Sequence, residues 1–404
     1  MKILFIQPTM DKRGHYGVYT SNLCQELGKI SELTLFTNKS VVSKYISETP
    51  SFEIVEYKNG KYGFEKFDEK KNKIPFYYTF GYLRNSFIII RAALKYIRKN
   101  KYDLIQIFDT EYSILSLLLL FYGSSSSKVV VHISAPNFAY NEYNGPFILK
   151  LYKMLQRNIL AYCIKKRVNG INSLGEYHRE MLIKQLEIPE SIAMGVIYDG
   201  ADFQKIEYTQ EIARNKLNID YKGFVFLFFG ILRRDKGIEY LLEAVSIIKD
   251  LDFKIIIAGA LFDYKEAELQ ALISKYGIKD KLIVKFEYIK DEEIPYYFFS
   301  ADVVVFPYIK KYRGGSGPLL KQAAIYKKPV LVTAVSEMGR LVKSRNMGIV
   351  VTSENVTALA DAMKGYMQIP REKRQQYGEN ASKTANTWKS MAQKYLNYFE
   401  IVVK

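Results

Sequence analysis

Short apolar runs alternate with segments of helical period along most of the chain. Such runs occupy residues 2–7, 33–37, 54–57, 104–108 and 129–133 in the first half, and 224–229, 254–258, 282–286, 302–307, 330–333 and 347–351 in the second. Between them, segments such as residues 18–29, 86–99, 111–121 and 238–249 have the pattern of helices. This alternation predicts parallel sheets covered by helices, the architecture of α/β proteins.

Two segments interrupt the alternation. Residues 59–73 are rich in lysine and predict a solvated loop. Residues 197–203, IYDGADF, are rich in turn-forming residues, and the strand and helix pattern restarts after them. We therefore predict two α/β domains, one over residues 1–196 and one beginning at residue 197.

The composition excludes several classes of protein. Of the 404 residues, 48% are hydrophobic and 25% are charged, which is typical of globular domains that bury large cores. The first apolar run is a strand rather than a signal peptide, and the run over residues 114–122 is shorter than the roughly 20 residues that span a membrane. Cys24 and Cys163 lie far apart in helical patterns, as buried thiols of a reducing compartment do. We expect a cytoplasmic protein.

The net charge of +17 predicts anionic partners. Nucleic acid, an acidic membrane surface and phosphorylated substrates all fit this charge. The basic residues are spread over both halves, and the sequence has no zinc-finger spacing, RNP-like aromatic motif or arginine-rich arm. We therefore do not expect a nucleic-acid partner.

Residues 146–167 combine basic and apolar side chains in a long helical pattern. The basic residues are Lys150, Lys153, Arg157, Lys165, Lys166 and Arg167, and the apolar ones are Phe147, Leu151, Tyr152, Leu155, Ile159 and Tyr162. One interpretation is a basic amphipathic helix at a membrane surface. The other, which we favour because helices usually cover the sheets of α/β domains, is an apolar stripe buried against the sheet with its lysines in water.

A glycine-rich turn precedes a helix in the second half. Within ADVVVFPYIKKYRGGSGPLLKQAAIYKKPVLVT, residues 301–333, a strand leads through Gly-Ser-Gly-Pro into a helix over residues 319–326. Pro318 suits the first turn of a helix, and Gly315 and Gly317 let a ligand approach the backbone. Free N–H groups at such a helix start favour an anion, most naturally a phosphate. The alternative is an ordinary connecting loop.

A second loop strengthens the phosphate interpretation. In FLFFGILRRDKG a strand ends at Gly230, and Arg233 and Lys236 lie three residues apart before the next helix. Because both loops follow parallel strands of one domain, they lie at the same edge of its sheet. The two cations can bind a diphosphate from one side while the Gly-Ser-Gly turn binds it from the other.

These motifs, with the IYDGAD segment and the MGIVV strand, resemble those of family 4 glycosyltransferases over essentially the whole chain. The resemblance implies a GT-B fold, in which two facing Rossmann-like domains with parallel sheets enclose a deep cleft. Residues 1–196 would form the acceptor-side domain and residues 197–385 the nucleotide-sugar-binding domain, while a last helix in residues 386–404 packs back on the first.

The resemblance also implies an activity. A sugar would pass, with retention, from a nucleotide diphosphate sugar to a glycan or lipid-linked glycan acceptor in surface polysaccharide biosynthesis. The enzyme would then work in the cytoplasm at the inner face of the cell membrane, with peripheral contact through basic, aromatic helices. No cofactor or metal ion is expected, because the donor phosphate serves as the base and the sequence has no Asp-x-Asp or histidine-rich cluster.

Site residues follow from the resemblance by position. Arg233 and Lys236 correspond to the cations that bind the donor diphosphate, and His132, at the end of a strand, to a histidine near the transferred sugar. The donor-binding positions are Gly14, Gly17, Gly230, Gly314, Gly315, Ser316, Gly317, Pro318 and Gln322, with Tyr288 and Ile289 near the base.

The chain departs from the family at two glutamates, eight positions apart, that flank the phosphate turn in many members. Gly314 and Gln322 stand there. Gln322 can hydrogen-bond a ribose hydroxyl, whereas beside Gly314 only Arg313 or Lys311 could reach the sugar, which would favour an acidic or modified sugar. Arg340 stands at a third position that is often glutamate. Two alternatives stay open: a non-catalytic partner subunit that binds a glycan or an acceptor protein, and a membrane scaffold that uses the basic helix.

Overall fold

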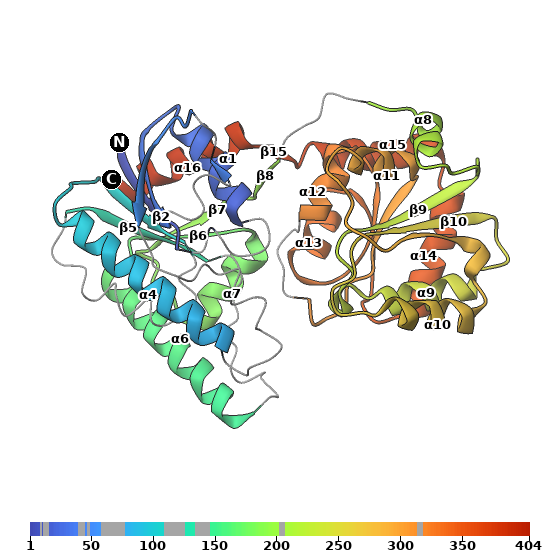
Figure 1. Cartoon of the computed structure of the whole chain (residues 1–404), viewed down its shortest axis with the longest axis horizontal. Helices are drawn as coiled ribbons and strands as arrows, with labels where there is room; N and C mark the ends of the chain where they lie inside the picture. The colour runs from blue at the N-terminus through green and yellow to red at the C-terminus, as the bar shows by residue number, and fades with distance from the viewer. Residues whose placement is uncertain are drawn as a thin grey trace. The chain divides into compact units, whose positions relative to one another are not determined.

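The chain forms two units in the computed structural model, which describes residues 1–8, 10, 16–38, 45–46, 49–57, 77–108, 126–133, 146–201, 207–312 and 318–404. The first unit is Met1–Gly200 with Asn386–Lys404, and the second is Ala201–Ala385 (Figure 1). The division after Gly200 falls four residues beyond the predicted end at residue 196. The predicted loop over residues 59–73 and the predicted helix over residues 111–121 lie outside the described residues.

A parallel sheet forms the centre of the first unit. Its strands are β1 (Lys2–Ile6), β2 (Glu32–Asn38), β3 (Glu53–Tyr57), β4 (Leu104–Ile107), β5 (Lys128–Ile133), β6 (Gly170–Ser173) and β7 (Ala193–Val196). Within the described residues they lie in the order β3-β2-β1-β4-β5-β6-β7. The five apolar runs predicted as strands in this half are thus confirmed.

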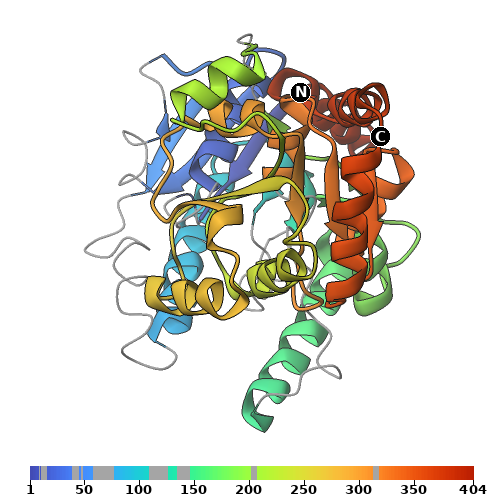
Figure 2. The ribbon, with the colours of Figure 1, turned by 90° about the vertical axis from the view of Figure 1, so that its right-hand side faces the viewer.

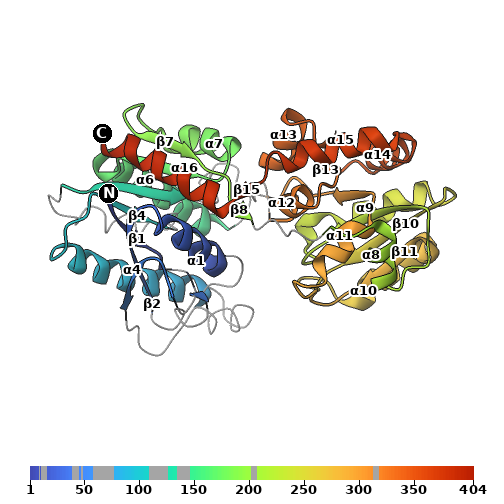
Figure 3. The same cartoon turned by 90° about the horizontal axis from the view of Figure 1, so that it is seen from above.

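Helices cover both faces of this sheet. They are α1 (Tyr16–Leu27), α4 (Tyr77–Ile97), α6 (Phe147–Arg167), α7 (Glu176–Leu186) and α16 (Trp388–Val403). Side chains of α4, α6 and α7 share a core with Ile105 and Val131, and those of α1 and α16 share the opposite core with Phe5 and Val130. Helix α16 lies along α1 (Figure 3), so the end of the chain completes the first unit. The short strands β8 (Gly200–Ala201) and β15 (Asn386–Thr387) pair with each other.

The favoured interpretation of α6 is confirmed for only part of the helix. The second half does bury its stripe on the sheet, through Leu160, Cys163 and Ile164. The apolar residues Phe147, Leu151, Leu155 and Tyr162 are 79%, 41%, 49% and 54% exposed. The reason is length: a helix of 21 residues spans about 31 Å, whereas the four to six residues of β4, β5 and β6 span about 13–20 Å. The first turns of α6 therefore extend past the sheet (Figures 1 and 2).

A second parallel sheet organises the second unit. Its strands are β9 (Phe224–Phe229), β10 (Phe253–Ala258), β11 (Leu282–Lys285), β12 (Val303–Phe306), β13 (Val330–Thr333) and β14 (Gly348–Val351). In the part of the chain that the structure describes, their order is β11-β10-β9-β12-β13-β14. From β9 the chain moves outward to β11 and then returns to the other side of β9, so the strand order reverses between β9 and β12.

Two layers of helices cover this sheet. The helices are α8 (Gln210–Lys216), α9 (Ile238–Ile247), α10 (Glu266–Tyr276), α11 (Ile294–Ser300), α12 (Pro318–Ile325), α13 (Ser336–Ser344), α14 (Val356–Gln368) and α15 (Arg371–Ser382), with 3₁₀ turns at Arg234–Lys236 and Lys279–Lys281. Helices α9, α10 and α14 pack on one face, and α11, α12, α13 and α15 on the other. Across the described ranges of both units, no helix is long and apolar enough to cross a bilayer.

Candidate functional site

The carboxyl ends of β9 and β12 form the centre of the candidate site. Both loops singled out in the sequence begin there: one follows β9 and carries Gly230, Arg233 and Lys236, and the other follows β12 and leads into α12. Loops on the two sides of a strand-order reversal run in opposite directions and leave a crevice between them. Small ligands of open parallel sheets bind in such crevices.

The loop after β9 is held by its neighbours on both sides. Leu232 N donates to Ala260 O at 2.8 Å beyond β10, and Ile309 N donates to Asp235 O at 3.1 Å beyond β12. The 3₁₀ turn Arg234–Lys236 ends at Gly237, which has a left-handed φ of 67°. The loop is therefore a fixed platform at the sheet edge.

Lys236 extends from this platform into the protein. Its side chain is buried, and Nζ lies 5.9 Å from the centre of the Tyr308 ring. An ideal Cβ built on Gly230 would lie 3.2 Å from this Nζ and 2.7 Å from Cδ1 of Leu319, so the missing side chain at Gly230 makes the space that Lys236 and the first turn of α12 share. Burial, reinforced by the charge of Arg233, lowers the pKa of Lys236 to about 8.

What distinguishes Lys236 from other buried lysines is that its ammonium group has no hydrogen-bond acceptor among the described residues. Lys328 offers a comparison, because burial also lowers the pKa of its side chain to about 8. Lys328 Nζ donates to Ala301 O at 2.9 Å, beyond the end of α11, and so stabilises the fold. For Lys236 the described residues supply neither a hydrogen bond nor an ion pair within hydrogen-bonding distance, although the nearby carboxylate of Asp235 favours its charged form.

Arg233, the other predicted diphosphate cation, is paired with a carboxylate in the structure. Its Nε and Nη2 donate to Oδ1 and Oδ2 of Asp235 at 2.9 and 2.8 Å. This bidentate pair fixes the plane of the guanidinium and offsets part of its charge. The role of Asp235 was not predicted, although the Arg-x-Asp spacing is visible in RRDK. Arg234 serves the fold, since it donates to Glu268 at 2.7 Å.

Helix α12 carries the second group of predicted residues. Gln322 lies in its second turn, and its Oε1 is buried without a hydrogen-bond partner among the described residues. Pro318 begins the helix as predicted. Gly314, Gly315, Ser316 and Gly317 lie outside the described residues.

The predicted base-contact residues follow β11. Ile289 is buried in the core beneath α11 and anchors the segment between β11 and α11, whereas Tyr288 is 71% exposed. An exposed aromatic ring beside a fixed residue can stack on a planar ligand. Of the two predicted residues, Tyr288 is thus the one whose side chain is accessible to a ligand.

In the first unit, His132 lies in β5 and is 4% exposed. Its Nδ1 is 3.2 Å from Nδ2 of Asn172 in β6 and 3.3 Å from the hydroxyl of Tyr395 in α16. Neither partner was predicted, because a contact between residues 132 and 395 leaves no local sign in the sequence. Gly14 lies outside the described residues. Gly17 was predicted in a loop but lies in the first turn of α1, where an added Cβ would meet the Tyr45 ring at 2.7 Å.

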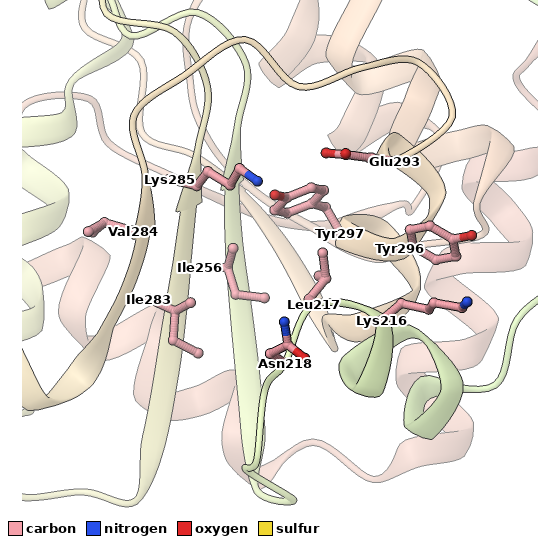
Figure 4. A pocket seen from close by; sticks show the side chains of 10 residues that line it. All are labelled: Lys216, Leu217, Asn218, Ile256, Ile283, Val284, Lys285, Glu293, Tyr296 and Tyr297. Carbon is pink, nitrogen blue, oxygen red and sulfur yellow. The ribbon is translucent and has the colours of Figure 1, made fainter.

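A pocket of about 320 Å³ lies elsewhere in the second unit (Figure 4). Its floor is formed by Ile256 and Ile283 in β10 and β11, and Tyr297 of α11 lines one side. Ile256 is a mid-strand residue, so the pocket faces the side of the sheet rather than its carboxyl edge. None of the predicted site residues lines it.

The described residues contain no group of three or more His, Cys, Asp or Glu side chains that could hold a metal ion.

Part of the second unit is similar in sequence to a known family of enzymes. Residues 209–384, most of the second unit, match the family model described as glycosyl transferases group 1. A curated relative, the D-inositol 3-phosphate glycosyltransferase of Arthrobacter sp. strain FB24, is 28% identical over 162 residues, which cover 39% of this chain and 38% of that enzyme. The chain thus matches less than half the length of this relative.

Solved structures resemble the whole chain. The glycosyltransferase of Rickettsia africae superposes with a TM-score of 0.72 at 17% identity and covers 100% of this chain and 98% of its own. Anabaena HepE in complex with UDP superposes with a TM-score of 0.73 at 15% identity, over 99% and 100%. At these identities the likeness concerns the fold alone, and the predicted fold class, α/β of GT-B type with two Rossmann-like domains, is confirmed.

Proposed function

We propose that this chain is a glycosyltransferase that moves a sugar from a nucleotide diphosphate sugar to a glycan or lipid-linked glycan acceptor. The observation that carries the proposal is Lys236, a buried cation at the strand-order reversal that makes no hydrogen bond or ion pair with the described residues. Keeping a charge from water is costly unless another charge compensates it, so this position favours a ligand with negative charge. The family match of the second unit supports the same assignment.

The chemistry follows from the charges. In the transfer, the bond between the anomeric carbon and the donor phosphate oxygen breaks, and a bond from the acceptor oxygen to that carbon forms. The acceptor proton passes to the departing diphosphate, which acts as the base. Lys236 and Arg233 stabilise the charge that develops on this leaving group, which is where fixed cations lower the barrier. Gln322 would accept a hydrogen bond from a ribose hydroxyl.

The remaining assignments rest on the family resemblance. His132 would contact the transferred sugar, and the main-chain groups at Tyr288 and Ile289 would contact the base. Retention of the anomeric configuration and a role in surface polysaccharide biosynthesis belong to the same proposal. Because Anabaena HepE was solved with UDP, uridine diphosphate is the first nucleotide to test.

A nucleotide panel tests the donor site. We expect one of UDP, GDP, ADP, dTDP or CMP, or the corresponding sugars, to raise the unfolding temperature of the wild-type chain. A ligand at about a hundred times its Kd stabilises by about 2.7 kcal/mol, which amounts to several degrees for domains of this size. The variant with Arg233→Ala and Lys236→Ala should lose the shift, and Arg233→Ala alone should lose part of it.

The absence of any nucleotide-dependent shift would favour the alternative that the chain is a non-catalytic partner subunit. If no nucleotide shifts the wild type at millimolar concentration while glycans still bind, the transferase proposal is wrong. Binding that survives in the double variant would instead move the donor site away from Lys236.

Nucleotide binding is expected to weaken as the pH rises past about 8, because the pKa of Lys236 is lowered to about 8. A bound diphosphate favours the protonated ammonium, so affinity is full below this pKa and falls by up to tenfold per pH unit above it. The free energy of unfolding of the ligand-free protein has the opposite pH dependence. The pKa of this lysine is about 10.5 in the unfolded chain and about 8 in the folded chain, so stability rises between about pH 8 and 10.5.

Calorimetric titration with UDP from pH 7 to 9.5 measures how the affinity for the nucleotide changes with pH. The nucleotide phosphates are already ionised over this range. Lys236→Arg keeps its charge and should flatten the profile. An equal slope in Lys236→Arg and wild type would contradict the assignment of the titrating group.

The exposed stripe of α6 supports peripheral contact with a membrane that carries a lipid-linked acceptor. Phe147, Ile148, Leu151, Leu155 and Tyr162 lie on one helical face and are 41–79% exposed. Basic side chains flank this face at Lys165 and Lys166. An apolar face with cations at its border is the arrangement that binds at the headgroup level of anionic bilayers.

Replacing Phe147 and Leu151 by serine is expected to reduce binding to phosphatidylglycerol vesicles by at least tenfold in flotation assays. Each buried apolar side chain contributes roughly 1.5–3 kcal/mol to such partitioning. The matched control is Ile212→Ser with Ile247→Ser, which removes side chains that are 46% and 53% exposed in the second unit. Equal binding by both double variants would rule out α6 as the contact.

A further inference from the structure

The loop after β10 lies against the loop after β9 at the carboxyl edge of the second sheet. Leu232 N donates to Ala260 O at 2.8 Å, and Phe262 N donates to Leu232 O at 3.1 Å. Leu232 and Leu261 form a parallel bridge, so the pairing of the two strands continues past their ends. In this register Phe262 is the neighbour of Arg233, and their main chains are about 4.8 Å apart.

The side chains of Arg233 and Phe262 lie on the same side of this ladder. Leu232 and Leu261 pack in the core beneath α9, α10 and α14. Because side chains alternate between the two faces, Arg233 and Phe262 are on the opposite side, which α11 and α12 cover. The environment of Tyr312 agrees, since this residue belongs to the core beneath α11 and α12. Burial raises the pKa of Tyr312 to about 12, and the nearby charge of Arg233 acts against this rise.

Arg234 holds the two loops together. Its main-chain N–H donates to Oδ1 of Asp263 at 2.9 Å, and its guanidinium donates to both carboxylate oxygens of Glu268 in α10, at 2.7 and 2.9 Å. The guanidinium carbon lies 4.5 Å from the centre of the Tyr264 ring. These contacts follow Phe262 directly in the sequence, so its main chain is fixed on both sides.

The ring of Phe262 is 66% exposed although its main chain is fixed. An aromatic ring on a fixed main chain can cover the flat face of a ligand at a low cost in conformational entropy. On one side its neighbour is Arg233, a predicted diphosphate cation. On the other side is the segment after β11, where Ile289 is buried on the face that α11 covers. Gly259 N donates to Lys285 O at 3.0 Å and joins the ends of β10 and β11.

We propose that the ring of Phe262 stacks on the base of the donor nucleotide. A nucleotide whose diphosphate lies at Arg233 extends past its ribose to the base, and the strand order places the end of β10 between Arg233 and the segment after β11. Stacking on a phenyl ring suits any base, since every base has a flat π face. The inference rests on the proposed function and adds Phe262 to the base contacts that the resemblance assigns to Tyr288 and Ile289.

Calorimetric titrations with UDP and with inorganic pyrophosphate separate the base contact from the phosphate contact, because pyrophosphate has no base. Another nucleotide of the panel replaces UDP if it is the one that binds. We expect Phe262→Ala to weaken nucleotide binding by roughly 5- to 150-fold, the range for loss of one base–aromatic stack. Its affinity for pyrophosphate should stay within about twofold of wild type. Phe262→Tyr keeps the ring and should bind the nucleotide as wild type does.

The matched control is Ile247→Ala, which removes a 53% exposed apolar side chain from α9 of the same unit. It should leave the affinities for nucleotide and pyrophosphate unchanged. Without ligand, the Phe262→Ala and Ile247→Ala variants should both unfold within about 2 °C of wild type, because surface substitutions change stability little. This comparison separates a lost ligand contact from a damaged fold.

Fluorescence of Phe262→Trp tests the stack directly. The natural chain has one tryptophan, Trp388, so the difference between variant and wild type reports the environment of residue 262. A base stacked on the new indole should quench this added fluorescence, whereas pyrophosphate should not.

If Phe262→Ala binds the nucleotide as tightly as wild type, or if the nucleotide does not quench Phe262→Trp, the inference is wrong while the proposed function stands. Equal losses for nucleotide and pyrophosphate also overturn it, because the substitution would then act through the phosphate contact. If pyrophosphate binds too weakly to measure, the fluorescence decides. If no nucleotide of the panel binds the wild type, the proposed function fails and the inference fails with it.

Discussion

Lys236→Met is expected to lower kcat for sugar transfer by roughly 10²–10³-fold, the cost of removing one preorganised group that stabilises developing charge. The charge on the leaving diphosphate is greatest in the transition state, and the buried Nζ is shielded from the solvent that would otherwise weaken its effect. Methionine keeps most of the length and apolar contact of the lysine stem, so the loss should be electrostatic. Release of the nucleotide product from a donor sugar measures it.

The control is Lys249→Met, which removes an exposed lysine near the end of α9. It should leave kcat within about twofold, as surface charges contribute little. If Lys236→Met changes only KM, Lys236 binds donor and transition state equally and has no role in the chemical step. If neither parameter changes, the donor diphosphate lies elsewhere.

Gly237→Ala is expected to destabilise the second unit by about 3 kcal/mol and to lower its unfolding temperature by about 6–12 °C. Two costs add: Gly237 has a φ of 67°, and an added Cβ would lie 2.1 Å from Pro307 O. The strain would separate the loop after β9 from the segment after β12. Nucleotide binding should therefore fall together with stability.

Gly365→Ala is the matched control. Gly365 lies within α14, and an added Cβ would have no atom within 4 Å. The substitution should stabilise by roughly 0.5–1 kcal/mol, because alanine loses less backbone entropy than glycine in a helix. Calorimetric scans of the two variants provide the comparison. Equal unfolding temperatures would mean that the loop around Gly237 relaxes freely.

Most strands of the two sheets could be predicted because parallel strands buried on two faces leave continuous apolar runs. The loop after β9 could also be predicted, because its signature residues, Gly230 and the RRDK segment, are close together in the sequence. Helix α13 was missed: Gly339 interrupts its helical pattern, and its start at Ser336 has a φ of 43° that only tertiary contacts stabilise. Strand β7 was missed as well, since AMGV is short and weakly apolar.

The finer features of the site depend on contacts that the sequence does not record. The sequence predicts Arg233 and Lys236 as two equivalent diphosphate cations, but Asp235 folds back on Arg233, and only Lys236 of the two makes no ion pair or hydrogen bond within the described residues. The burial of α6 depends on where the sheet ends, which no periodicity within the helix can reveal. Tyr395 reaches His132 only because the last helix returns to the first unit.

Because α16 belongs to the first unit, the two units are completed in a different order from the one in which they begin. Met391, Ala392, Tyr395 and Phe399 of α16 are fully buried in the first unit, although the ribosome adds them after the whole second unit. The second unit, Ala201–Ala385, is therefore synthesised completely while the first still exposes the apolar surface that α16 will cover. Nascent chains should be protease-sensitive and chaperone-dependent in their first half until α16 has been synthesised. For the same reason, a fragment that stops at Gly200 should aggregate unless residues 386–404 are joined to it.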